Sequence, residues 1–279
     1  YRSITGCFDT SIIEEHKHRY KSITESILRK LVENYDDAVV GQSKVMKHIL
    51  PALYSQHRNA RKRPVVLLFL GDSGIGKTET AKYISDVLGE RLVRIQCSMQ
   101  QTNIAYQYIF GGEHNQNSMA RDLIRRTSNV ILLDEFDKVH PQFYNAFYQM
   151  FDEGKYVDSS YEVDVSKCVF ICTSNFQSRT EAEKQLGKPI LSRFSEVVIF
   201  EPLSAESKMR IVDNALETYI SKLSKADRKI MEEKNGTKSI RAEFENVIKR
   251  GGGYGNIRML KNDIENAINY KMLEWKGLL

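Results

Sequence analysis

The stretch LLFLGDSGIGKTETAKYI, residues 67–84, joins a short apolar run to a glycine-rich turn and then to a segment with helical spacing. It satisfies the pattern G-x-x-x-x-G-K-[ST] at Gly71, Gly76, Lys77 and Thr78. The apolar run predicts a buried strand, and the later segment predicts a helix. Because such a turn directs backbone N–H groups and a helix N-terminus at one place, it predicts a bound nucleoside triphosphate.

Individual residues of this turn have predicted roles. Lys77 is expected to reach the β- and γ-phosphates of ATP, and the Thr78 hydroxyl is expected to bind Mg²⁺. We predict that the following residues of this turn contact the nucleotide: Asp72, Ser73, Gly74, Ile75, Gly76, Lys77, Thr78 and Glu79.

Composition narrows the class of protein. The 279 residues can form one large domain, or a large and a small one. A hydrophobic content of 41% and a charged content of 28% indicate a globular rather than a disordered chain. The longest apolar run, residues 65–70, is too short to cross a membrane, and no apolar leader opens the sequence, so we expect a cytoplasmic protein without a membrane partner. A net charge of +5 permits an acidic partner without requiring one.

The cysteines and histidines do not have the spacing of metal ligands. Cys168 and Cys172 lie four residues apart in the apolar run CVFIC, so we interpret them as buried core thiols. The histidines are scattered among charged residues and are expected at the surface. The sequence therefore predicts no zinc site.

A second stretch supplies the acids that hydrolysis needs. NVILLDEFDKVHP, residues 129–141, is another buried-strand run that ends in Asp134 and Glu135. A carboxylate at the end of a neighbouring strand can hold Mg²⁺, which is the role we predict for Asp134. Glu135 can take a proton from the attacking water, so we predict it as the general base.

Four stretches, in this order and spacing, resemble the AAA+ ATPases. They are GDSGIGKTETAK, VILLDEFDKVHP, FDEGKYVD and TSNFQS. More narrowly they resemble the Clp-type unfoldases and disaggregases, especially the second ATPase module of the disaggregase. The resemblance runs from about residue 38 to about 270. It implies an α/β fold, with a P-loop NTPase large domain whose parallel sheet is flanked by helices, followed by a small α-helical lid domain.

The resemblance also sets the expected domain limits. We place the large domain at residues 36–201 and the lid at 202–279, because strand-like runs stop near Pro202 and amphipathic helical spacing follows. Residues 1–35 are an N-terminal helical extension, the stub of an upstream domain, or an adaptor-binding segment. The sequence leaves this choice open.

Further site residues follow from the resemblance. The segment VVGQSKVMKHILPAL resembles the one that packs on adenine, which implies contacts from Val39 and Val40. Asn175, at the end of CVFICTSN, is the expected sensor 1, which orients the attacking water. Arg193 matches the arginine finger that reaches the nucleotide of an adjacent subunit. Arg258 is the expected sensor 2, although Asn-Ile precedes it where the Clp pattern has Gly-Ala.

The polypeptide-gripping residue of the unfoldases has a candidate in the stretch before Asp134. Counting back from this residue places Phe110 where the channel aromatic belongs, with Gly111 beside it and Tyr108 as an alternative. An aromatic ring can contact almost any side chain, which suits a grip that ignores sequence. Residues 151–165 read as a hairpin and as a second channel loop.

Three functions remain open at this point. The first is an ATP-driven protein-remodelling motor that works as a ring of six subunits on a polypeptide. It would lack a chambered-protease partner, because residues 176–189 contain no Ile-Gly-Phe or Ile-Gly-Leu tripeptide. The second is a nucleic-acid-directed AAA+ ATPase, for which the basic cluster HRNARKR, residues 57–63, is the only positive feature. The third is a regulatory module that switches on ATP without translocating.

Overall fold

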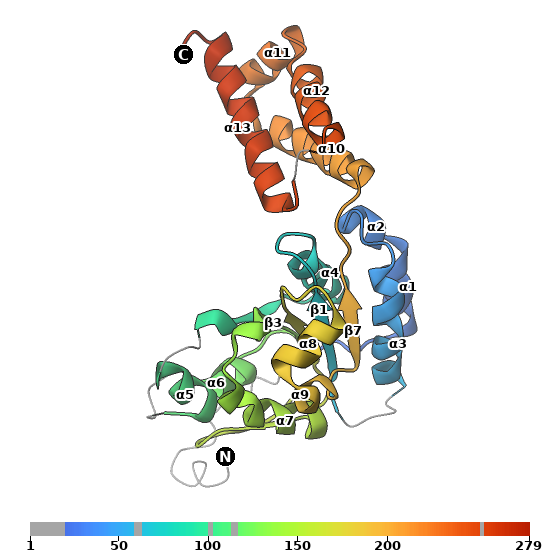
Figure 1. Ribbon diagram of the computed structural model, residues 1–279, viewed down its shortest axis with the longest axis vertical. Coiled ribbons are helices and arrows are strands. Elements are labelled where there is room, and N and C mark those ends of the chain that lie inside the picture. The colour runs from blue at the N-terminus through green and yellow to red at the C-terminus, as the bar shows by residue number, and fades with distance from the viewer. Residues whose placement is uncertain (1–19, 59–62, 100–102, 113–116, 252–253) are drawn as a thin grey trace, which may run out of the picture.

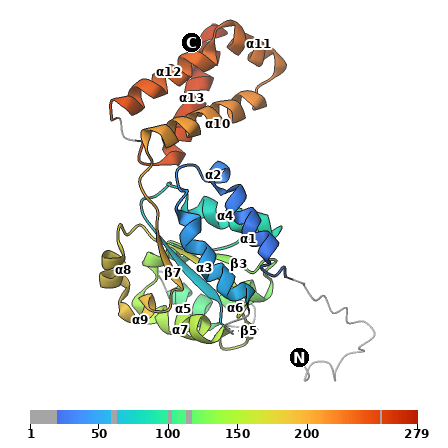
Figure 2. The same cartoon turned by 90° about the vertical axis from the view of Figure 1, so that its right-hand side faces the viewer.

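The computed structural model describes residues 20–58, 63–99, 103–112, 117–251 and 254–279. These residues form an α/β unit and, beyond β7, a unit made of helices (Figures 1 and 2). The strands are β1 (Val65–Leu70), β2 (Val93–Gln96), β3 (Val130–Asp134), β4 (Lys155–Val157), β5 (Glu162–Asp164), β6 (Val169–Thr173) and β7 (Glu196–Ile199). The expected α/β architecture, a parallel sheet flanked by helices, is confirmed.

Helices follow the strands or flank the sheet. In the α/β unit they are α1 (Glu25–Glu33), α2 (Tyr35–Ala38), α3 (Val45–His57), α4 (Lys77–Leu88), α5 (Asn103–Phe110), α6 (Met119–Ile124), α7 (Tyr144–Glu153), α8 (Arg179–Leu186) and α9 (Lys188–Leu191). The described residues also include the short 3-10 turns η2 (Cys97–Met99), η3 (Phe136–Lys138) and η4 (Pro141–Phe143).

The main sheet has five parallel strands in the order β2-β3-β6-β1-β7. All six residues of β1 are buried, as expected for a central parallel strand covered on both faces. Its side chains alternate between the two faces: Val66 and Leu68 join one hydrophobic cluster, and Leu67 and Phe69 join the other. The first cluster packs against α5–α9, the second against α1, α3 and α4.

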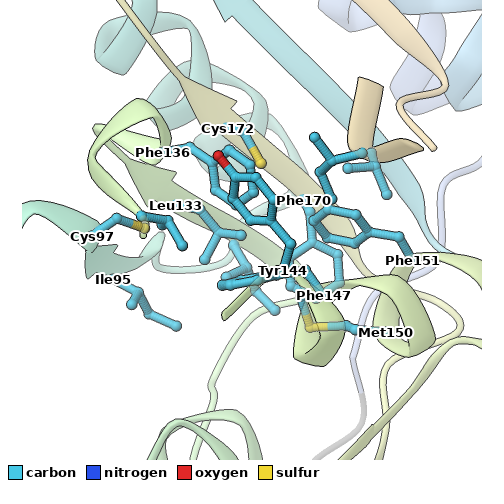
Figure 3. Packing of buried hydrophobic residues seen from close by; sticks show 14 of the residues in the cluster. Ile95, Cys97, Leu133, Phe136, Tyr144, Phe147, Met150, Phe151, Phe170 and Cys172 are labelled. Carbon is cyan, nitrogen blue, oxygen red and sulfur yellow. The ribbon is translucent and has the colours of Figure 1, made fainter. Parts of the chain in front are cut away.

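An aromatic group fixes the turn that follows β3 (Figure 3). Phe136 is fully buried and lies edge-on to Phe147, with ring centroids 5.2 Å apart. Phe194 also meets it edge-on, at 6.0 Å. Such ring pairs contribute about 0.5–1.5 kcal/mol each beyond the area that they bury. Because Phe136 directly follows Glu135, this packing holds the two acids at the end of β3 in place.

Helix α1 packs as part of the α/β unit. Leu28 and Leu31 are buried in the same cluster as the sheet residues on that face, and the ring of Tyr35 meets that of Tyr83 at 5.5 Å. From the sequence, residues 1–35 are expected to be an N-terminal extension. The end of this segment, from Leu28 to Tyr35, shares the core of the α/β unit. Residues 1–19 lie outside the described residues.

The helical unit consists of α10 (Ala205–Lys222), α11 (Lys225–Glu233), α12 (Gly236–Lys249) and α13 (Ile257–Trp275). It has its own hydrophobic cluster, which includes Val212, Leu216 and Ile264. Two residues from outside these helices, Val40 and Leu203, complete this cluster at the side that faces the α/β unit. The connection that precedes α10 therefore lies where the two units meet.

Candidate functional site

The phosphate loop runs from the end of β1 to the start of α4 at Lys77. Two of its glycines are required by close contacts as well as by backbone conformation. Gly71 has φ +128°, and a Cβ on it would lie 2.7 Å from the carbonyl oxygen of Phe200. Gly74 has φ +76°, and a Cβ on it would lie 2.1 Å from Oδ1 of Asn256. Residues with a side chain rarely adopt such φ values, so these two positions favour glycine. Because glycine has no side chain, the backbone of the loop can approach a phosphate closely.

Lys77 is a buried cation at the centre of the loop. Its Nζ donates to the carbonyl of Gly71, to that of Asp72 at 2.8 Å and to Oδ1 of Asn175 at 3.3 Å. Burial lowers the pKa of Lys77 to about 8, although the nearby carboxylates, Asp137 first among them, oppose this effect. A bound phosphate chain would favour the charged form of this side chain.

Asp134, the last residue of β3, and Glu135, directly after it, have different hydrogen-bond partners. Oδ1 of Asp134 accepts a hydrogen bond from the Thr173 hydroxyl at 2.5 Å, and its Oδ2 is paired with the guanidinium of Arg94. Glu135 has φ +56°, uncommon for a residue other than glycine, and its amide donates to Thr173 Oγ1 at 3.0 Å. The Gln96 side-chain amide donates to Oε2 of Glu135 at 2.8 Å.

These groups surround a cavity of about 380 Å³ at the carboxyl ends of the strands. Most predicted nucleotide-site residues line it: Val39, Val40, Ser73, Gly74, Gly76, Lys77, Thr78, Glu79, Asp134, Glu135, Asn175 and Arg258. Asp72 and Ile75 do not. Oδ1 of Asp72 accepts from Gln177 Nε2 at 2.8 Å, and Ile75 is buried beneath the loop. In the loop, Asp72 is thus expected to act through its carbonyl, which binds Lys77.

The helical unit closes one side of this cavity. The amide of Ile257 donates to the carbonyl of Gly74 at 2.9 Å, and Asn256 caps α13 by accepting from the amide of Arg258 at 2.8 Å. Arg258 and Lys261, three residues apart on α13, both line the cavity. Apolar walls come from Val39 and from Ile211 of α10.

Several lining residues escaped the sequence-based prediction. They are Asp37, Ala38, Arg94, Thr173, Ser174, Ile211, Asn214, Ile257 and Lys261. Thr173 had a usable signal, because it stands directly before Ser174 and Asn175 at a strand end. Lys261 could have been found as the cation one helical turn after Arg258. Arg94 had no motif around it, since β2 is a short edge strand.

Arg193 lies away from this cavity. Its Nε pairs with Oδ2 of Asp152 at 2.8 Å, its Nη1 donates to the Pro189 carbonyl, and its guanidinium lies over the Tyr148 ring at 4.1 Å from the centroid. About a quarter of the side chain is exposed. A role toward its own subunit's nucleotide is therefore not supported, whereas a role toward a neighbouring subunit stays a prediction.

The predicted channel aromatics lie at the end of α5. The ring of Phe110 is partly buried between those of Tyr106 and Phe143, at centroid distances of 4.8 and 6.1 Å. The amide of Ser159 donates to the Phe110 carbonyl at 2.9 Å, which ties this segment to the antiparallel hairpin β4–β5. Tyr108 packs on the core, and its hydroxyl donates a hydrogen bond to Asp122 at 2.6 Å. These contacts disfavour Tyr108 as the aromatic side chain that contacts a polypeptide in the channel.

The donor set fits a magnesium ion. The Thr78 hydroxyl and the Asp134 carboxylate line one cavity, and hard cations such as Mg²⁺ prefer oxygen ligands completed by water and phosphate. Within the described ranges, no group of three or more His, Cys, Asp or Glu side chains could hold a metal by itself. Cys97, Cys168 and Cys172 are buried free thiols. Burial raises their pKa values, which agrees with inert core thiols.

Comparisons with known proteins identify the family of this chain. Residues 62–249 match the profile of the family described as AAA domain (Cdc48 subfamily). The chaperone protein ClpB of Helicobacter hepaticus is 31% identical over 229 residues, which are 72% of this chain and 26% of that protein. ClpB of Clostridium tetani is 26% identical over 301 aligned positions, covering 96% of this chain and 33% of that protein. The chain thus spans about a quarter to a third of these relatives.

A solved structure gives the same fold. It is a closed-state cryo-electron microscopy reconstruction of Hsp104 with ATPγS and FITC-casein. It matches with a TM-score of 0.69 and 22% identity, over 90% of this chain and 49% of that one. Among the described helices, none has both the length and the apolar character of a membrane span.

Proposed function

The chain belongs to the AAA domain (Cdc48 subfamily) family, among the Clp-type AAA+ ATPases, and from this premise we propose that it hydrolyses ATP to remodel polypeptides. One observation carries the proposal. A single cavity gathers a phosphate-loop lysine, two acids, a polar amide and an arginine from separate segments: Lys77, Asp134, Glu135, Asn175 and Arg258. This is the set that phosphoryl transfer to water needs.

Each residue has a distinct task in the proposed reaction. Lys77 and the loop amides bind the β- and γ-phosphates, while Val39 and Val40, which line the same cavity, pack on adenine. Thr78 and Asp134 would hold Mg²⁺, which supplies charge neutralisation for the phosphate oxygens. Glu135 takes the proton of the attacking water, and Asn175 orients that water. Arg258 stabilises negative charge on the γ-phosphate from the side of the helical unit.

The quaternary part of the proposal concerns Arg193. We infer a hexameric ring in which this guanidinium reaches the nucleotide of the adjacent subunit. Its place outside its own cavity supports this role, as does its partial exposure. Residues 36–201 and 202–279 would then act as two units whose relative position follows the nucleotide. Of the predicted N-terminal extension, residues 1–35, the part before Leu28 would connect to an upstream domain or adaptor, because the rest shares the core of the α/β unit.

The substrate part of the proposal is an extended polypeptide drawn through the ring. Phe110 and Gly111 would lie at its channel, and the hairpin β4–β5 would form the second loop. The Hsp104 reconstruction includes FITC-casein, so this fold is compatible with a protein substrate. The basic cluster at residues 57–63 lies partly outside the described residues, and no other feature favours nucleic acid. We propose a cytoplasmic location.

The deciding experiment compares ATP hydrolysis by the purified full chain alone, with an unfolded protein such as casein, and with single- or double-stranded DNA. A remodelling motor is stimulated by the unfolded protein and not by DNA. Glu135→Gln is the matched control, because it should bind ATP and turn it over at background rate. Stimulation by DNA alone would overturn the protein-remodelling function, and no ATP binding at all would overturn the site.

A further inference from the structure

Arg94 pairs with the predicted magnesium ligand, and nothing in the proposed reaction assigns it a task. It is the second residue of β2, which lies beside β3 in parallel, with Gln96 opposite Asp134. Residues 94 and 96 are two apart, so they lie on the same face of this strand. The guanidinium Nη2 donates to Oδ2 of Asp134 and, at 3.1 Å, to Oε1 of Gln96.

The ion pair with Arg94 lies on Asp134 Oδ2, and a metal ion at this oxygen would have to compete with it. Oδ1 of Asp134 already accepts from Thr173, so the guanidinium takes the remaining oxygen of this carboxylate. The Asp134 side chain is only 10% exposed, whereas that of Arg94 is 54% exposed and also lines the nucleotide cavity. A second cation brought to Oδ2 would be repelled by the guanidinium at short range.

The two side chains differ in their freedom to move. Asp134 is held by the end of β3 and by the Thr173 hydroxyl, and the buried Phe136 packs two residues later. Arg94 has a long flexible stem on an edge strand, with its head half in solvent. When this ion pair breaks, Arg94 therefore moves and Asp134 stays in place.

We propose that Arg94 is a positioning residue that competes with magnesium for Asp134, and thereby sets the metal concentration at which the nucleotide is bound tightly. In the absence of metal it neutralises the buried acid and keeps the carboxylate oriented. Metal binding at Oδ2 would require Arg94 to release that oxygen. This inference rests on the proposed function, because it takes Asp134 as the metal ligand.

The test measures magnesium dependence by binding and not by turnover. Fluorescent N-methylanthraniloyl-ADP is titrated into the full chain in EDTA and at a series of MgCl₂ concentrations. For Arg94→Gln we expect the half-saturating magnesium concentration to fall by up to about five-fold, which is the change that loss of a partly exposed ion pair gives. The affinity for the nucleotide in EDTA should stay within about two-fold of wild type, because Arg94 competes with the metal ion and does not itself bind the nucleotide.

Arg91→Gln is the matched control. It removes the same charge three residues earlier, from an exposed side chain that does not line the cavity, so the magnesium requirement should not change. Arg94→Lys keeps the charge on a shorter stem and should shift the requirement in the same direction by less. That variant decides the question if Arg94→Gln does not fold.

Each outcome has one meaning. An unchanged or higher magnesium requirement in both Arg94 variants would overturn the competition. Weaker binding in EDTA would overturn it too, since Arg94 would then be a phosphate ligand. If the wild-type chain itself shows no magnesium-dependent nucleotide binding, the proposed function fails. If wild type shows it and the Arg94 variants match wild type, only this inference fails.

Discussion

The backbone amide of Ile257 donates a hydrogen bond to the carbonyl of Gly74, with 2.9 Å between the two atoms. The last helix of the helical unit therefore begins directly on the phosphate loop. Asn256 completes this contact, since its side chain fills the space in which a Cβ of Gly74 would lie. We therefore expect a displacement of the phosphate loop to displace the start of α13, and a displacement of α13 to displace the loop.

Gly74→Ala should uncouple the two units. The alanine would be strained at φ +76°, by about 1–2 kcal/mol, and its Cβ would collide with Asn256. We expect nucleotide affinity to fall and the amide of Ile257, which donates to the Gly74 carbonyl, to exchange its hydrogen faster. Gly251→Ala is a matched control, because Gly251 has a similar φ of +74° but no atom of the described residues within 4 Å of an added Cβ. Equal effects of both changes would contradict the coupling.

Nucleotide binding should take up a proton near pH 8. Burial lowers the pKa of Lys77 to about 8, and bound phosphates would raise it again, so affinity should fall as the pH rises above about 8. The free energy of unfolding of the nucleotide-free chain should change in the opposite direction. It should increase from pH 8 to 10.5, because in this range Lys77 is still protonated in the unfolded chain but has lost its proton in the folded one. Calorimetry in buffers of different ionisation enthalpy measures the uptake.

The control for this titration is Lys82→Met. Lys82 is an exposed lysine on the same helix and does not line the cavity, so its removal should leave the proton uptake intact. Lys77→Met should abolish the uptake together with most of the affinity. Uptake that persists in a Lys77 variant would place the titrating group elsewhere.

Glu135→Gln should separate binding from turnover. The amide keeps the size of the side chain but removes the base, so we expect ATP affinity within a few-fold of wild type and hydrolysis lower by about 10²–10⁴. Equilibrium binding and single-turnover hydrolysis of ATP measure the two effects. Residual hydrolysis close to the wild-type rate would assign the base to another group.

Arg193→Ala should slow hydrolysis only in the assembled ring. In nucleotide hydrolases such an arginine contributes about 10³–10⁵ in rate, while the intrachain pair with Asp152 is partly exposed and worth at most about 1 kcal/mol. Asp152→Asn breaks the same pair and leaves the guanidinium, so it should keep hydrolysis. If both variants lose activity equally, the role of Arg193 is to hold the fold of its own subunit.

Phe110→Ala should impair substrate processing and leave basal ATP hydrolysis unchanged. Tyr106 supports the ring of Phe110 and is itself 57% exposed, so Tyr106→Ala is expected to reduce processing as well. Unfolding of a fluorescent protein substrate, measured beside ATP hydrolysis, distinguishes the two activities. Full processing by Phe110→Ala would remove this residue from the channel.

The sequence by itself determined the fold class and the residues next to strand ends. Asp134 ends β3, Asn175 stands shortly after β6, and Lys77 follows β1 after the glycine-rich turn. The carboxyl ends of parallel strands meet at one edge of a sheet, so the convergence of these residues could be predicted. The glycine pattern and the strand–loop–helix order likewise act over short distances. Local spacing carries this information.

Only the tertiary structure decided which distant segments complete the site. Arg94 lies on a short edge strand and meets Asp134 because β2 pairs with β3, 40 residues apart in the chain. Ile211 and Lys261 reach the cavity because the helical unit packs over the phosphate loop at Gly74. These contacts depend on long-range packing of two hydrophobic cores, which no local pattern of residues encodes.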